Sequence, residues 1–277
     1  MSQEIIKKFK IKAKKSLWQN FLIDENILDK IALSIDIKWQ NIIEIWPWYW
    51  ALTEKLLNSK PKSLHLVELD NEMIQILKER IQKNELKIDN INFEIFNEDI
   101  LKFIPSFKDN NYYVIANIPY YITSPILFKF LYEIKNLPKK MVILLQKDVA
   151  DKIIEWQNNT KVKSSYLSLF ISKKCCVKTI TFVPSKAFSP APKVNSEVLL
   201  FETHKNFNEI NDTDFLKLLK IWFKSPRKKL LNNLENWWYK KEQILEIYKK
   251  LNLSENIRWE ELDTLKWIDL FKAISKI

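Results

Sequence analysis

The chain has 277 residues, of which 47% are hydrophobic and 13% aromatic, so it can bury the cores of one large and one small domain. Its 45 Lys and Arg outnumber 34 Asp and Glu, and the net charge of +11 favours nucleic acid or an anionic membrane surface as the partner. Charged residues interrupt every hydrophobic stretch before the roughly 18 residues of a spanning helix. These features exclude a membrane-spanning protein and predict a soluble one.

The first 16 residues are basic and contain no long apolar run, which indicates a basic arm and not a secretory or targeting segment. The only two cysteines, Cys175 and Cys176, are adjacent and therefore unsuited to the geometry of a disulfide. We expect neither a disulfide framework nor a zinc or other metal site, and a cytoplasmic location fits this cysteine usage.

Glycine is absent from the sequence, although typical usage of about 7% would give roughly 19 glycines in a chain of this length. Tryptophan occurs 11 times, including at Trp46, Trp48, Trp50, Trp237 and Trp238, where turns are expected. Such turns call for glycine, because only a residue without Cβ adopts positive φ at little cost. We hypothesise that UGA encodes glycine in this gene and that tryptophan arises from translation with the wrong code; the alternative is a tryptophan-rich protein.

Strand-like runs alternate with helical patterns through the first half of the chain. Strands are expected at 41–45, 63–69, 91–96, 112–117 and 141–145, and helices at 51–58, 71–83 and 125–135. Two later runs, 177–183 and 197–202, resemble final antiparallel strands on either side of a Pro-rich segment. This order predicts an α/β fold with a mostly parallel sheet and helices on both faces.

The pattern changes after residue 204, where only helices are expected. They are predicted at 212–223, 226–234, 240–250, 258–262 and 264–275. The predicted organisation is therefore a first domain of residues 1–204, including the basic arm, and a small helical domain of residues 205–277.

A nucleotide-binding loop is predicted where the strand NIIEI is followed by WPWYW and the helix ALTEKLL. With glycine restored, the segment becomes EIGPGYGALTEKLL, in which the backbone can approach a ligand beside the free N–H groups of the helix. Glu68 ends the next strand roughly 20 residues later, where an acidic side chain accepts hydrogen bonds from ribose hydroxyls. Pyrophosphate cofactors use the same arrangement, so the loop and Glu68 leave the cofactor open.

Asp99 follows the next strand, in the position where methyltransferases place an acidic contact to an adenine amino group. An alternative is that Asp99 caps the helix that begins with ILKFI. The loop, Glu68 and Asp99 together favour S-adenosylmethionine.

The tetrapeptide Asn117, Ile118, Pro119 and Tyr120 matches the motif of amino-group methyltransferases. An exocyclic amine is a poor nucleophile, because its lone pair delocalises into the ring. The Asn117 amide oxygen and the Ile118 carbonyl can accept its N–H bonds, and Tyr120 can stack on a base flipped out of its helix or loop. No general base is needed, and alignment supplies much of the rate. A simple turn after a buried strand remains the alternative.

Five segments resemble the rRNA adenine dimethyltransferase family and span nearly the whole chain. They are KKSLWQNFLID, EIWPWYWALTEKLL, NIPYYITSPILFKFL, AFSPAPKVNSEV and FKSPRKKLLNNL. The resemblance implies a Rossmann-like, S-adenosylmethionine-dependent methyltransferase domain followed by a helical RNA-binding domain.

The same resemblance implies roles for individual residues. Asn20 and Leu22 would reach the methionine end of the cofactor, and Trp46 stands where the family has a glycine contact. Glu68, Asp99 and Asn117 would complete the cofactor site. Phe188 would form the second face of an adenine sandwich, whereas without the family it would be interpreted as a core aromatic. Arg227, Lys228 and Lys229 would contact RNA phosphates, in place of an ordinary solvated helix face.

The implied activity is dimethylation at N6 of two adjacent adenosines in the 3′-terminal hairpin loop of 16S rRNA, by a monomer acting on the assembling 30S subunit. One alternative is the related 23S rRNA dimethylase of the macrolide-resistance type. Another is a non-catalytic RNA-binding assembly or transcription factor on the same fold. YYITSPI and RKKLLNNL favour the first activity. If the tryptophans are literal, Trp46 and Trp48 would fill the cofactor loop and leave an inactive protein.

Overall fold

The computed structural model describes residues 2–9, 11, 13–14, 19–88, 90–107, 111–157, 165–224, 228–235 and 239–276. The chain divides into two compact units, which are described separately. The first comprises residues 1–150 and 177–203, and the second residues 151–176 and 204–277. The segment 151–176 thus groups with the helical unit, and the domain boundary near residue 204 stays a prediction.

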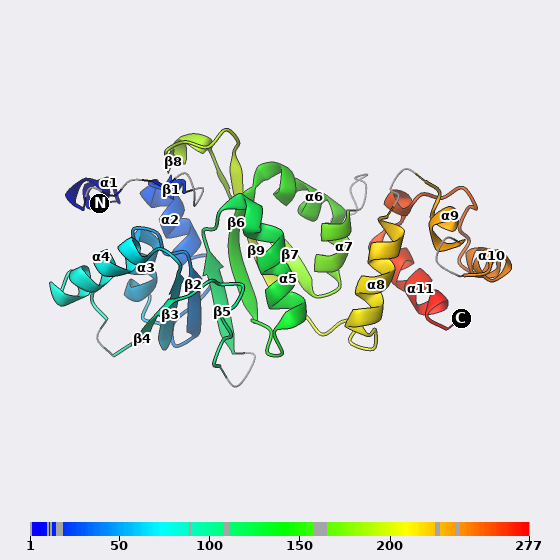
Figure 1. The fold of residues 1–277 in the computed structure, drawn as a ribbon, viewed down its shortest axis with the longest axis horizontal. Coiled ribbons are helices and arrows are strands. Elements are labelled where there is room, and N and C mark those ends of the chain that lie inside the picture. The colour runs from blue at the N-terminus through cyan, green and yellow to red at the C-terminus, as the bar shows by residue number, and fades with distance from the viewer. Residues whose placement is uncertain are drawn as a thin grey trace. The chain divides into compact units, whose positions relative to one another are not determined.

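The first unit is built on a sheet of seven strands in the order β4-β3-β2-β5-β6-β9-β7 (Figure 1). Its parallel strands are β2 (Asn41–Ile45), β3 (Ser63–Glu68), β4 (Asn92–Asn97), β5 (Tyr112–Ala116) and β6 (Lys140–Gln146). β9 (Ser196–Thr203) pairs antiparallel with β6, and β7 (Cys175–Val183) lies beside β9 at the edge. The mostly parallel α/β sheet is confirmed, with β9 as the antiparallel strand.

The central strands form because their apolar runs are buried on both faces, as parallel strands require. Ile42, Ile43 and Ile45 of β2 and Val114 and Ile115 of β5 are fully buried. The helices of this unit are α1 (Ser2–Lys8), α2 (Glu25–Ala32), α3 (Ala51–Asn58), α4 (Asn71–Gln82), α5 (Thr123–Phe128) and the start of α6 (Lys147–Gln157).

Two of these helices begin at aspartate caps that fix their start beside the sheet edge. The Asp24 side chain accepts two N–H groups of the first turn of α2, and the Asp70 side chain accepts one, that of Glu72, in α4. The helix expected at 125–135 begins two residues earlier as α5 and continues through residues 129–133 as a wider π-helical turn.

A second, two-stranded sheet pairs β1 (Phe21–Leu22) with β8 (Phe188–Ser189) in antiparallel orientation. Leu22 lies opposite Phe188 in this pairing. The pairing therefore brings the segment after the basic arm next to the Pro-rich segment, although they are far apart in the sequence.

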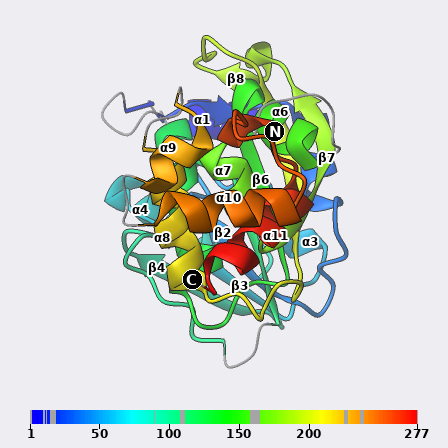
Figure 2. The same cartoon turned by 90° about the vertical axis from the view of Figure 1, so that its right-hand side faces the viewer.

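Among its described residues, the second unit is helical apart from Cys175 and Cys176, which begin β7. Its helices are α7 (Tyr166–Ser172), α8 (Asp212–Trp222), α9 (Leu230–Glu235), α10 (Lys241–Lys250) and α11 (Thr264–Ile274), with a 3-10 turn at Trp259–Glu261 (Figure 2). Its core is aromatic, with the rings of Trp222 and Trp267 4.4 Å apart. Among all described residues, no helix is long and apolar enough to cross a bilayer.

Candidate active site

The candidate site lies where the carboxyl ends of β2, β3 and β5 meet at one edge of the sheet. The strand order changes direction between β2 and β5, and ligands of open α/β sheets bind in the crevice at such a point. The loop after β2, the end of β3 and the tetrapeptide after β5 all lie at this edge.

The loop after β2 holds three tryptophans in the left-handed region. The φ angles of Trp46, Trp48 and Trp50 are 56°, 50° and 67°. Trp50 occupies the cap position of α3 without any side-chain cap hydrogen bond. A bulky residue in this region stores about 1 to 3 kcal/mol of strain, which glycine avoids. The loop geometry is therefore that of a glycine turn.

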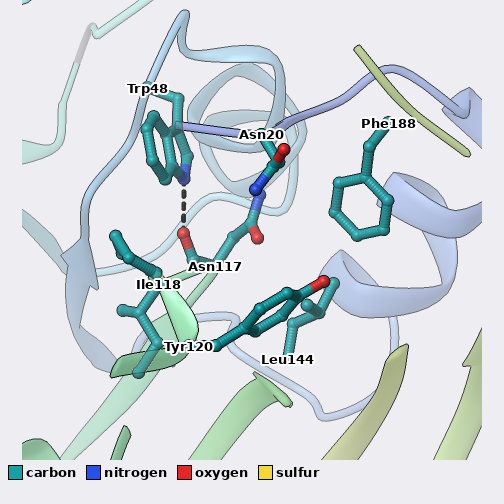
Figure 3. Close-up of a pocket in the computed structure, with 8 residues that line it drawn as sticks. Asn20, Trp48, Asn117, Ile118, Tyr120, Leu144 and Phe188 are labelled. Carbon is teal, nitrogen blue, oxygen red and sulfur yellow. Dashed lines mark hydrogen bonds between the residues drawn. The ribbon is translucent and has the colours of Figure 1, made fainter. Parts of the chain in front are cut away.

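The indoles of this loop are buried and leave little free space around them. Trp46 and Trp48 are buried, with stacked rings 6.4 Å apart, and the Nε1 of Trp48 donates a hydrogen bond to the backbone carbonyl of Asn117. The pocket beside them has about 10 Å³ of free volume, room for about one water molecule. Figure 3 shows Trp48 on one side of Asn117 and the rings of Tyr120 and Phe188 on the other.

Glu68 ends β3 with a buried carboxylate. Its Oε1 accepts the backbone N–H of Asp70 at 2.8 Å, whereas its Oε2 has no hydrogen-bond partner among the described residues. Burial raises the pKa of Glu68 to about 8, which the Asp70 N–H partly opposes. A buried acceptor with one unused oxygen can receive a hydroxyl donor, as the ribose role requires.

Glu44 is a buried acid that the sequence analysis missed. It lies in β2, faces a cavity shared with Leu22, Trp46, Trp48 and Asn117, and neither carboxylate oxygen has a hydrogen-bond partner among the described residues. Burial raises its pKa to about 8; the nearby Thr53 hydroxyl, outside hydrogen-bonding geometry, opposes this shift and the charge of Glu68 adds to it. The sequence feature that could have identified Glu44 is an acidic residue within the otherwise apolar strand NIIEI.

Asp99 is half-buried after β4, where its Oδ1 accepts the N–H of Leu101 at 3.0 Å. The backbone carbonyl of Asp99 accepts the N–H groups of Lys102 and Phe103. Residues 100–102 form a turn and not the helix expected after Asp99, so the side chain of Asp99 stabilises a turn instead of capping a helix. An adenine contact through the second carboxylate oxygen of Asp99 stays a prediction.

The tetrapeptide after β5 places polar and aromatic groups around one pocket. Asn117, Ile118 and Pro119 are buried, and Tyr120 is half-buried. The Tyr120 hydroxyl lies 2.6 Å from the Ser196 hydroxyl of β9, which fixes the tilt of the ring. Burial raises the pKa of Tyr120, so the phenol stays neutral at physiological pH.

The short sheet brings the remaining predicted residues of the first unit to this pocket. Asn20 and Phe188 line it together with Asn117 and Tyr120, and Leu22 lines the adjoining cavity. The Tyr49 hydroxyl donates to the backbone carbonyl of Leu22, which holds β1 against the loop. The predicted cofactor and amine residues therefore line these two cavities or, like Glu68 at the end of β3 and Asp99 after the end of β4, lie at the same sheet edge.

The predicted RNA contacts belong to the helical unit. Arg227 lies outside the described residues, as do Trp237 and Trp238. Lys228 and Lys229 are exposed, and the Lys229 Nζ donates to the Asn256 side chain at 2.7 Å. Their exposure leaves both ammonium groups accessible to solvent.

Residues 10–276 match the family model for ribosomal RNA adenine dimethylase. The chain belongs to the ribosomal RNA adenine dimethylase family. Ribosomal RNA small subunit methyltransferase A of Mycoplasma mobile is 41% identical over 263 residues, which cover 95% of this chain and 98% of the relative. The protein of the same name from Pelagibacter ubique is 36% identical over 265 residues, with 95% and 97% covered.

Solved structures of similar proteins give the same fold. A dimethyladenosine transferase from Plasmodium falciparum is 27% identical, with a TM-score of 0.77 over 92% of this chain and 98% of that chain. The 23S rRNA methyltransferase ErmE is 18% identical, with a TM-score of 0.71 over 92% of this chain and its full length. The Rossmann-like methyltransferase fold with a helical C-terminal region is thereby confirmed.

The residues at the sheet edge partly fit the S-adenosylmethionine of this family. The free Oε2 of Glu68 and the unpartnered carboxylate of Glu44 supply acceptors for hydroxyl and ammonium donors. The indoles of Trp46 and Trp48 leave about 10 Å³ in the cavity beside Glu44, too little for the cofactor. The polar groups therefore fit S-adenosylmethionine, whereas the side chains of the loop after β2 do not.

Proposed function

We propose that the protein dimethylates N6 of two adjacent adenosines in the 3′-terminal hairpin loop of 16S rRNA, with S-adenosylmethionine as the methyl donor. The observation that carries the proposal is the shared pocket of Asn20, Asn117, Tyr120 and Phe188 at the end of β5. The names of the relatives, small subunit methyltransferase A, support the small subunit as the target.

We infer that the acidic groups at the sheet edge bind the cofactor, which supplies an electrophilic methyl group when bound. Glu68 would accept the ribose hydroxyls and Asp99 the adenine amino group. Asn20 and Leu22 would meet the methionine end. The carboxyl group of Glu44 lies in the same cavity as Leu22, and the positive charge of the cofactor would lower its pKa and so favour its ionised form.

The target adenine would be held by residues that enclose the pocket beside Asn117. The Asn117 amide oxygen and the Ile118 carbonyl would accept the N–H bonds of the amine and direct its lone pair towards the methyl group. Tyr120 and Phe188 would stack on the base, with the Tyr120 ring held by Ser196. Pro119 is buried and restricts the backbone between Ile118 and Tyr120.

We further propose that the natural protein carries glycine at Trp39, Trp46, Trp48 and Trp50. All four have positive φ, whereas Trp222, Trp259 and Trp267 do not. Trp39 adds a position that the sequence analysis did not single out. Mass spectrometry of the protein from its own cells tests this assignment, and tryptophan at these positions would refute it.

We also propose that residues 205–277 form a helical RNA-binding domain in which Arg227, Lys228 and Lys229 contact phosphates of the assembling 30S subunit. The net charge of +11 supports a polyanionic partner. In this proposal the protein acts as a monomer in the cytoplasm. Sedimentation of the purified protein, alone and with immature small subunits, tests both the monomer and the partner.

A methylation assay on immature small subunits tests the activity, with glycine in place of Trp46, Trp48 and Trp50. We expect label only in the 3′-terminal loop of 16S rRNA. Label confined to 23S rRNA would favour the large-subunit dimethylase. Calorimetry without any heat of S-adenosylmethionine binding would favour a non-catalytic RNA-binding factor.

A further inference from the structure

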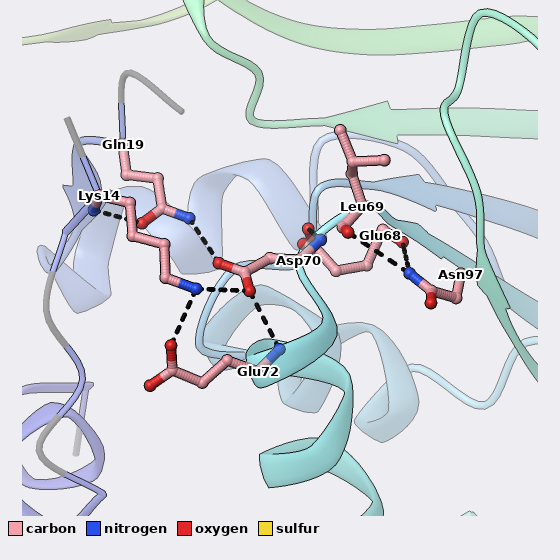
Figure 4. A network of polar contacts seen from close by, with 7 residues as sticks. All are labelled: Lys14, Gln19, Glu68, Leu69, Asp70, Glu72 and Asn97. Carbon is pink, nitrogen blue, oxygen red and sulfur yellow. Dashed lines mark hydrogen bonds and ion pairs between the residues drawn. The ribbon is translucent and has the colours of Figure 1, made fainter. Parts of the chain in front are cut away.

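The basic N-terminal arm is attached to α4 through ion pairs at both ends of the helix. The Lys14 Nζ lies 2.7 Å from Asp70 Oδ1 and 2.8 Å from Glu72 Oε2, at the start of α4 (Figure 4). The Lys8 Nζ lies 2.5 Å from Glu85 Oε1, just beyond the end of α4. Two charges of the arm are therefore neutralised within the same unit.

The pair between Lys14 and Asp70 differs from an ordinary surface ion pair, because the side chain of Asp70 is only 4% exposed. Asp70 Oδ1 also accepts the N–H of Glu72 at 3.0 Å, and Oδ2 faces the Gln19 Nε2 at 3.4 Å. A buried carboxylate needs such donors, since it has lost its water. The two carboxylates raise the pKa of Lys14, mainly through its hydrogen bond with Asp70.

Gln19 extends the same cluster into the segment that reaches the cofactor pocket. Its Oε1 accepts the backbone N–H of Lys14 at 2.8 Å, so Lys14 and Gln19 are joined to each other as well as to Asp70. Asn20, the next residue, lines the pocket with Asn117. On the opposite side, the backbone N–H of Asp70 donates to Glu68 Oε1.

We propose that Lys14, Gln19 and Asp70 are positioning residues that latch the N-terminal segment over the cofactor site. The latch orders the segment carrying Asn20 and Leu22 next to Glu68 before the cofactor arrives. Binding then loses less conformational entropy, so removal of the latch weakens cofactor binding without touching the amine site. The inference rests on the proposed function only in naming S-adenosylmethionine as the ligand that the latch encloses.

The test uses two variants of Lys14 in the latch and one control variant outside it. Lys14→Met removes the ammonium group, Lys14→Arg keeps a cation, and Lys178→Met removes a matched cation from the distant pair of Lys178 with Glu202, 2.7 Å apart on β7 and β9. Hydrogen exchange reports the segment directly through the Ile23 amide, which donates to the Ala187 carbonyl at 2.8 Å.

Hydrogen exchange is measured on the full chain as printed. Calorimetry with S-adenosylmethionine and steady-state kinetics use the full chain with glycine at Trp46, Trp48 and Trp50. For Lys14→Met we expect at least fivefold faster exchange of residues 19–23, a roughly tenfold higher Kd and KM, and kcat within twofold of the parent. Lys14→Arg and Lys178→Met should match the parent in all four quantities.

Unchanged exchange and unchanged Kd in Lys14→Met would overturn the latch. If RNA affinity alone fell in that variant, Lys14 would instead be a phosphate contact. If the parent with glycine in its loop bound no S-adenosylmethionine, the proposed function would fail, while the exchange measurement would still support or refute the latch.

Discussion

The indole Nε1 of Trp48 donates a hydrogen bond to the backbone carbonyl of Asn117, and this bond joins the strained loop directly to the tetrapeptide that we propose binds the target amine. Trp48 has a φ of 50°, and Asn117 is buried directly after the end of β5. The contact therefore occupies one of the acceptors near the proposed cofactor and target amine. A glycine at position 48 would release it.

The first prediction concerns this loop. The triple variant with glycine at Trp46, Trp48 and Trp50 should bind S-adenosylmethionine with a micromolar-class Kd, because the indoles leave only about 10 Å³ in the cavity next to Glu44. The printed sequence should bind weakly or not at all. Calorimetry of both proteins checks this, and equal affinities would refute the steric argument. Glycine at Trp267 alone should not restore binding, since Trp267 lies in the core of the helical unit.

The second prediction separates the two kinds of tryptophan by the sign of a stability change. Trp39 has a φ of 59° and is 69% exposed, so Trp39→Gly relieves strain and opens no cavity. Relief of about 1 to 3 kcal/mol, reduced by the added freedom of the unfolded chain, should raise the free energy of unfolding by about 1 kcal/mol.

Trp267→Gly is the matched control for that prediction. Trp267 is 1% exposed inside α11, and its loss should lower the free energy of unfolding by about 3 to 5 kcal/mol or more. Urea denaturation of the two variants measures both changes. Destabilisation by both would remove the argument that Trp39 stands in a glycine position.

The alternation of apolar runs with helical patterns was enough to predict the central fold. β2 and α3 have the bounds expected from the sequence, because a continuously apolar strand and an amphipathic helix each leave a period that can be counted. The order of these elements also fixed a largely parallel sheet. The loop after β2 could be predicted from the tryptophans at positions 46, 48 and 50, because the residues found in turns depend on the local backbone conformation.

Features that depend on distant parts of the chain were not predictable. β1 and β8 have two residues each, too few to show a period, and they pair across more than half of the sequence. The contact of Lys14 with Asp70 spans 56 residues, and a lysine in a basic arm gives no sign of a buried partner. The grouping of 151–176 with the helices also depends on tertiary packing.

The third prediction follows from the two buried acids. The pKa values of Glu44 and Glu68 are about 8 in the folded protein, against an ordinary value of 4.5. The folded state therefore holds these protons more tightly than the unfolded chain does. The stabilisation of the folded state by these two protonated acids is fully present below pH 4.5. It is lost as the pH rises towards 8, by at most about 1.4 kcal/mol per pH unit for each group.

Urea denaturation between pH 5 and pH 8.5 tests this dependence. Glu44→Gln and Glu68→Gln should each flatten the fall in stability, since the amide stays neutral throughout. Glu202→Gln is the control, because Lys178 lowers the pKa of Glu202 and that carboxylate keeps its charge over this range. A slope that persists in Glu44→Gln and Glu68→Gln would show that other groups control the pH dependence.

The fourth prediction assigns Asn117 to the target amine rather than to the cofactor. In the protein with glycine in its loop, Asn117→Ala should lower kcat by two or more orders of magnitude, because the acceptor that orients the amine is lost. The Kd for S-adenosylmethionine should change only a few-fold, since Glu68 and Asp99 would still bind the nucleoside. Ser196→Ala provides a graded comparison, because it removes only the 2.6 Å contact that tilts Tyr120 and should lower kcat by roughly tenfold. Single-turnover methylation of immature small subunits separates chemistry from binding in both variants. Normal turnover in Asn117→Ala would rule out its role in orienting the amine, and a large loss of cofactor affinity would move Asn117 to the cofactor site instead.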